Sequence, residues 1–203
     1  KKEGMITNVE RSDIVKEIKE WSKYALEVSS PDFNNLPPCP YAKAAWKENK
    51  GDVVFETSRE SYQVLYATLN GWKDKKELVI VVDTEFVEDP NEFHQFVDNL
   101  NEAIADGAFV DKDFWVMGFH PEDETNELID DGTFEGETEV QYALLFVQRL
   151  SKLEKAAEKL RPLGYYDRYF QEYDVTKMYQ LRTNFYRQLM PGVANGDFRN
   201  NNF

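Results

Sequence analysis

Cysteine and histidine are scarce in this chain, and their scarcity limits the chemistry that it can carry. The 203 residues include one cysteine and two histidines. One cysteine excludes an internal disulfide and is typical of a reducing compartment, so we expect a soluble cytoplasmic protein. No HxxxH or CxxC pattern occurs, so we predict no metal site. The glycines are scattered and form no phosphate-binding loop, so the sequence names no cofactor.

Long apolar runs and an excess of positive charge are also missing. The longest aliphatic run, from Leu78 to Val82, is far shorter than the ~20 residues that span a membrane, so we expect no membrane partner. The net charge of -14 makes nucleic acid an unlikely partner, because DNA and RNA binding needs a basic face. The partner that we expect is a small-molecule ligand.

The chain does contain an alternation of strand and helix patterns. Apolar runs predict strands over 53–56, 78–82 and 114–119. Apolar residues at helical spacing predict helices between these strands, and one long helix over 140–160. Strands separated by helices predict an α/β fold with a small, mostly parallel sheet of three or more strands and helices packed around it.

The second half of the chain suggests an appendage to this domain. We expect the α/β domain to cover residues 5–161, and residues 162–190 to form an aromatic connector and a C-terminal helix packed on it. Residues 191–203 are rich in glycine and asparagine and predict a flexible tail. The apolar face of the C-terminal helix needs a cover, and a homodimer through that helix is the alternative to packing on the parent domain.

Cys39 lies in the one stretch where local physics suggests reactivity. Pro40 is suited to the first position of a helix, which would make Cys39 the N-cap. The helix dipole and the nearby Lys43 would then favour the thiolate, so we predict a lowered pKa. The alternative is a buried cysteine that acts as a small hydrophobic residue.

Polar residues follow two of the predicted strands. Asp83 and Glu85 end one of them, and His120 and Glu122 end another. In parallel strands these ends meet at one edge of the sheet, where ligands of such folds bind. Cys39 and His120 would be the catalytic pair, with Cys39 as the nucleophile and His120 as the base. Asp83, Glu85, Glu122 and Lys43 would have binding roles. A metal held by His120, Glu122, Asp83 and Cys39 is a further alternative.

Two short motifs resemble a bacterial family of uncharacterised proteins. These motifs are Cys39-Pro40-Tyr41-Ala42, after Trp21 on the first helix, and Gly118-Phe119-His120-Pro121. Their order and spacing fit that family from about Ser12 to Leu160. The family's Asn-Arg-Ser-Pro-like stretch after Phe-His-Pro is absent here, so the resemblance implies equivalence at Cys39 and His120 only. It implies no known reaction.

Two functions are therefore open. One is a small-molecule enzyme that uses Cys39 and His120 at the sheet edge. The other is a non-catalytic, acidic protein-interaction module, whose surface would include the aromatic connector from Tyr165 to Tyr173. The distance between Cys39 and His120 distinguishes them, because acid–base assistance requires hydrogen-bond reach or one bridging water.

Overall fold

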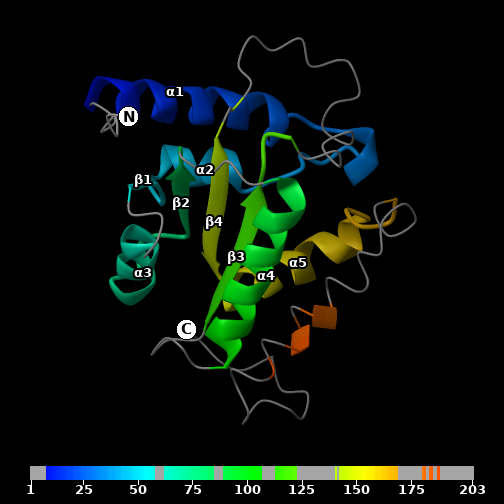
Figure 1. Cartoon of the computed structure of the whole chain (residues 1–203). Coiled ribbons are helices and arrows are strands. Elements are labelled where there is room, and N and C mark those ends of the chain that lie inside the picture. The colour runs from blue at the N-terminus through cyan, green and yellow to red at the C-terminus, as the bar shows by residue number, and fades with distance from the viewer. Residues whose placement is uncertain are drawn as a thin grey trace.

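A computed structural model describes residues 8–57, 62–84, 89–106, 113–122, 140 and 142–168, with helical positions at 180, 181, 183, 184 and 187. Its described residues form an α/β fold around one four-stranded sheet (Figure 1). The strands are β1 (Gly51–Glu56), β2 (Leu78–Asp83), β3 (Phe114–Phe119) and β4 (Ala143–Arg149). The helices are α1 (Asn8–Ala25), α2 (Ala42–Lys47), α3 (Gln63–Asn70), α4 (Pro90–Ala105) and α5 (Leu150–Leu160).

The sheet is mixed, with the strand order β1-β2-β4-β3. β1 and β2 are parallel, whereas β4 runs antiparallel to both β2 and β3. The α/β class is therefore confirmed, but a mostly parallel sheet is not. The difference arises at β4, because the sequence pattern had placed residues 143–149 in one long helix. Their apolar side chains fit a strand that is buried on both faces equally well, and periodicity alone does not separate the two.

Helices cover both faces of the sheet. α3 and α4 pack on one face, in a core that includes Leu65, Phe93, Val81 and Leu145. Residues of α1 and α2 pack on the other face, with Ile18, Trp46 and their neighbours against alternate residues of the same strands. Figure 1 shows α4 lying along β3. We call these the α3/α4 face and the α1/α2 face.

The start of α4 and its contact with β3 follow from specific residues. Asp89 is the N-cap, as the Asp-Pro pattern predicts, and its Oδ1 accepts hydrogen bonds from the backbone N–H groups of Asn91 and Glu92. Gly118 of β3 allows Phe93 to approach closely, since a Cβ at Gly118 would lie 2.5 Å from the Phe93 ring. The first turn of α4 is thereby fixed against the end of β3.

α5 follows β4 directly, and a separate segment stabilises its first turn. The Asp113 carboxylate accepts hydrogen bonds from the backbone N–H of Ser151 at 2.8 Å and from its hydroxyl at 2.5 Å. Beyond α5, Tyr165 and Tyr166 are buried in a small cluster with Phe33, Ala157 and Leu160. This third cluster joins the end of α5 to the segment that precedes Cys39.

Most of the predicted C-terminal helix and the whole of the tail lie outside the described residues. Helical positions do occur between 180 and 187, and among them the side chain of Leu181 is 47% exposed. Among the described residues, none of the helices has both the length and the apolar character that crossing a membrane requires.

Candidate functional site

Three buried ionisable side chains lie at one edge of the sheet. Glu56, Asp83 and His120 are 2%, 3% and 4% exposed, and they stand at the carboxyl ends of β1, β2 and β3. These three strands point in the same direction, because β2 and β3 both run antiparallel to β4. The prediction that Asp83 and His120 share an edge is therefore confirmed, although an antiparallel strand separates β2 from β3.

The three side chains also point to the same face. Glu56 is paired with Asp83, and Asp83 is paired with Ala143 of β4. The last β3–β4 pair joins Phe119 to Leu144, so the next step of that register sets His120 beside Ala143. Alternation along the strands places all four residues on the α3/α4 face. We call Glu56, Asp83, Ala143 and His120 the polar row. Two strand spacings separate Asp83 from His120 in this row, so their backbones are about 10 Å apart.

Glu56 joins the polar row to α3. Its two carboxyl oxygens accept hydrogen bonds from the backbone N–H groups of Thr57 and Leu65, each at 3.0 Å. The N-cap residue of α3, Tyr62, supplies no side-chain hydrogen bond of its own. Glu56 therefore acts as a distant cap for this helix. Sequence reasoning missed it, because its main partner is nine residues further along the chain.

His120 is held in one orientation by the backbone that follows it. The Glu122 N–H donates a hydrogen bond to His120 Nδ1 at 3.1 Å. Since Nδ1 accepts this bond, the proton of the neutral imidazole is on Nε2. The ring centre of Phe93 on α4 lies 5.7 Å from that of His120. The other histidine, His94, is only partly buried, on α4.

Cys39 is not the N-cap of a helix, and its predicted pKa shift is wrong in sign. α2 begins at Ala42 with Tyr41 as its N-cap, so the turn of Cys39 to Tyr41 precedes the helix. Burial raises the pKa of the Cys39 thiol, while hydrogen bonds from the backbone of Tyr41 and Ala42 lower it less, and the Glu27 carboxylate raises it a little further. Backbone N–H groups do face the sulfur, as expected, but loss of solvation outweighs them.

None of the contacts described for Cys39 involves His120, and none described for His120 involves Cys39. The backbone N–H of Cys39 donates to the Leu26 carbonyl at the end of α1, and the Tyr165 hydroxyl donates to the Pro38 carbonyl next to Cys39. The groups that influence the thiol are Tyr41, Ala42 and Glu27. His120, in contrast, packs against Phe93 on the α3/α4 face.

The remaining predicted binding residues are dispersed. Glu122 reaches the polar row through its backbone, while its side chain is exposed. Lys43 is exposed on α2, a helix of the opposite face. Glu85 lies outside the described residues. Of the predicted set, only Asp83, His120 and the Glu122 backbone come together.

The alternative metal site is not assembled. Among the described residues, no three side chains of histidine, cysteine, aspartate or glutamate form a group that would hold a metal ion. The spacing of the polar row explains this result, because a strand separates Asp83 from His120.

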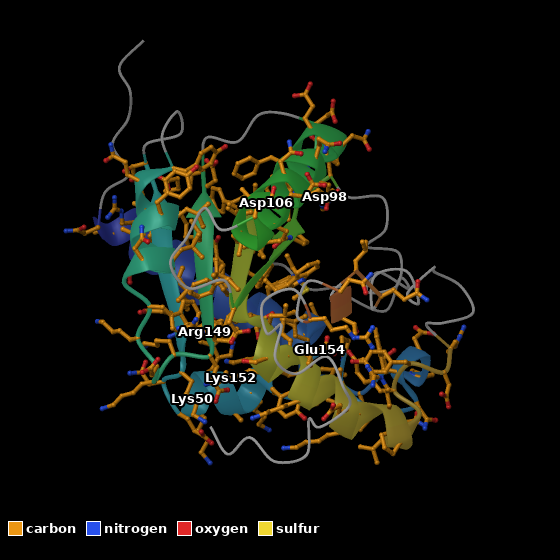
Figure 2. The ribbon with its side chains drawn as sticks, turned by 90° about the horizontal axis from the view of Figure 1, so that it is seen from below. Lys50, Asp98, Asp106, Arg149, Lys152 and Glu154 are labelled. Carbon is orange, nitrogen blue, oxygen red and sulfur yellow. The ribbon has the colours of Figure 1, made fainter. Side chains whose placement is uncertain are left out.

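Basic side chains occupy the other end of the sheet. Figure 2, which views the molecule from below, labels Lys50, Arg149 and Lys152 there. Lys50 forms ion pairs with Glu48 at 2.8 Å and Glu77 at 3.1 Å. The Arg149 guanidinium lies 4.4 Å from the centre of the Phe114 ring. The two carboxyl groups of the polar row are thus at the opposite end of the sheet from these cations.

Comparisons of the chain with protein-family models, with curated proteins and with solved structures gave no match. The resemblance to the bacterial family with the Cys-Pro-Phe/Tyr-Ala and Phe-His-Pro motifs stays a prediction.

Proposed function

We propose that the protein is a small-molecule enzyme of the cytoplasm, and that its proton-transfer site is the polar row. The observation that supports this most is the convergence of Glu56, Asp83 and His120 on one edge and one face. Acidic side chains are rarely buried without a specific role, and a histidine among them suits proton transfer near neutral pH. The carboxyl ends of strands are also where α/β folds bind their ligands.

The three side chains would have different roles. Both carboxyl oxygens of Glu56 are engaged by backbone N–H groups, so we assign it the task of holding α3 in place. Asp83 and His120 would contact the substrate, and Ala143 between them contributes only a methyl group. The Nδ1 of His120 is engaged by the Glu122 N–H, so Nε2 is the atom assigned to proton transfer.

The proposed site does not include Cys39. A catalytic thiol must ionise readily, whereas burial raises the pKa of this one. Of the aromatic connector on which the interaction-module alternative rests, Tyr165 and Tyr166 are buried in the cluster with Phe33, and residues 169–173 lie outside the described residues.

A ligand screen tests the proposal. A library of small neutral and cationic metabolites would be tested for thermal stabilisation of the wild type, Asp83→Asn and His120→Asn, with His94→Asn as the matched control. Asparagine at position 120 keeps an acceptor for the Glu122 N–H and removes Nε2. We expect compounds that stabilise the wild type and His94→Asn, and that are turned over at least ~100-fold more slowly by His120→Asn. Turnover by His120→Asn and by Asp83→Asn at the wild-type rate would contradict the proposed roles.

A further inference from the structure

One residue near the polar row has a backbone conformation that its own side chain disfavours. Among the described residues, four other than glycine have positive φ angles, and three of these are asparagines. Asparagine tolerates the left-handed region, whereas a bulky side chain is strained there. The fourth residue is Tyr62, with φ 45° and ψ 44°, directly before α3. Such strain persists only where the surrounding structure imposes it, and it is concentrated at functional sites.

Hydrogen bonds and a ring contact hold the turn at Tyr62. The Tyr62 carbonyl accepts a hydrogen bond from the Tyr66 N–H at 3.0 Å, and the Leu65 N–H of the same turn is bonded to the Glu56 carboxylate. The Tyr62 ring stacks on the ring of Phe96 from α4, with the ring centres 4.6 Å apart and the planes 19° apart. Both rings are partly buried against the core of the α3/α4 face. The strained turn therefore connects one end of the polar row to α4.

The same helix contacts the other end of the polar row. Phe93 lies one turn before Phe96 on α4, and its ring centre is 5.7 Å from that of His120. The close approach of this ring to Gly118 fixes the helix against β3. A continuous series of contacts thus runs from the end of β1, through Tyr62 and α4, to the end of β3. It lies on the face to which the polar row points.

We propose that Tyr62 is a positioning residue of the polar row, which holds α3 and α4 at the separation where Asp83 and His120 act on one substrate. The inference rests on the proposed function, in which these two side chains contact the substrate. The substrate would lie between the first turns of the two helices, over the methyl group of Ala143. Glycine or asparagine would form the turn with less strain, so the strain at Tyr62 results from the need for an aromatic ring at this position.

Three variants of Tyr62 separate the ring from the backbone. Tyr62→Phe keeps the ring and the strain, Tyr62→Ala removes the ring alone, and Tyr62→Gly removes both. Glycine adopts a positive φ without strain, so we expect Tyr62→Gly to unfold at least ~2 °C above Tyr62→Ala. If Tyr62→Gly were no more stable than Tyr62→Ala, the backbone would not be strained in the folded protein and the proposal would fail.

Turnover separates this inference from the proposed function. For a compound of the ligand screen that His120→Asn turns over slowly, we expect Tyr62→Gly to lower kcat at least ~10-fold and Tyr62→Phe to keep it. A wild-type kcat in Tyr62→Gly would overturn the positioning role and leave the proposed function intact. A wild type that turns over none of the library would instead contradict the proposed function, and the following measurement, which uses the protein alone, still tests the positioning role.

NMR spectra of the free protein supply that measurement. The ring resonances of His120 depend on its distance from the Phe93 ring. We expect Tyr62→Gly to shift them while the backbone amides of α1, on the opposite face, keep their wild-type positions. Phe96→Leu removes the other half of the stack and should cause a similar shift. A residue that served only the stability of α3 would change the unfolding temperature without moving these resonances.

Tyr66→Ala is the matched control, because Tyr66 is on the same helix and its side chain is 42% exposed. It should leave the ring resonances of His120 in place, as should Tyr62→Phe. Resonances of His120 that stay unchanged in both Tyr62→Gly and Phe96→Leu would overturn the proposal, since the stack would then have no influence on the catalytic end of the sheet.

Discussion

The turn at Cys39 and the polar row are the two places where the sequence suggests chemistry, and burial acts differently on them. At Cys39 burial is the main influence on the thiol and raises its pKa, so the reactive form is disfavoured. In the polar row, two of the buried groups are held by defined backbone donors: Glu56 by Thr57 and Leu65, and His120 by Glu122. A buried polar group becomes useful when hydrogen bonds orient it, and otherwise burial only suppresses its charge.

The largest expected effect concerns Glu56. Replacing it by alanine leaves the Leu65 N–H buried without its acceptor and removes the distant cap of α3. We expect Glu56→Ala to lower the free energy of unfolding by about 3 kcal/mol, as measured by urea denaturation. Glu56→Gln, which keeps one acceptor oxygen, should lose roughly half as much.

Glu122→Ala is the control for this prediction. Its carboxylate is exposed near the same edge, so its effect should stay within about 0.5 kcal/mol. If Glu56→Ala were as stable as this control, the polar row would not be part of the framework that positions α3.

The sequence predicted three of the four described strands, and the shared edge of Asp83 and His120, more accurately than the reactive residue. The bounds of β3 agree with the sequence analysis, because a bounded apolar run is a local pattern, and the Asp-Pro pattern at the cap of α4 is equally local. The pKa of Cys39 depends on burial by distant parts of the chain, and its neighbour Pro38 is bonded by Tyr165. No local pattern contains that contact.

Two further features escaped prediction for similar reasons. β4 has apolar side chains on both faces, so its spacing also fits a helix, and only its place between β2 and β3 decides the outcome. Glu56 looks like a charged residue that ends an exposed strand. Its burial becomes clear only when Leu65 is known to lie beside it.

A second prediction concerns the contact that holds His120 against α4. A methyl group at Gly118 would lie 2.5 Å from the Phe93 ring and 2.9 Å from Val97, so the ring must move away from β3. We expect Gly118→Ala to lower the free energy of unfolding by about 2 kcal/mol and to shift the ring resonances of His120 in NMR spectra. Unchanged stability and unchanged His120 resonances would show that α4 does not fix this side of the polar row.

A smaller effect is expected at the Cys39 turn. Tyr165→Phe removes the hydroxyl that donates to the Pro38 carbonyl but keeps the aromatic packing on Phe33. The variant should lose about 1 kcal/mol of stability, and Cys39 should react faster with iodoacetamide because its turn opens more often. Tyr24→Phe, at an exposed position, is the control and should change neither quantity. Equal reactivity in both variants would argue that Tyr165 does not protect the thiol.

The smallest effect is the pH dependence of stability that Cys39 causes. The folded state keeps the thiol protonated because burial raises its pKa, whereas the unfolded chain ionises at the pKa of a free thiol. Between these two values the folded protein binds more protons, so its stability falls as pH rises through that range. Cys39→Ala should remove this part of the fall. An identical pH dependence in the wild type and in Cys39→Ala would contradict the raised pKa.

The most direct test of the central claim uses one NMR experiment that observes both places at once. The 15N-labelled protein would be titrated with each compound that stabilises it in the ligand screen, and the shifted backbone amides would be assigned. Our account predicts that the largest shifts occur at the ends of β1, β2 and β3, around Thr57, Thr84 and Glu122. Shifts concentrated at Cys39, Tyr41 and Ala42, with the strand ends unchanged, would contradict it.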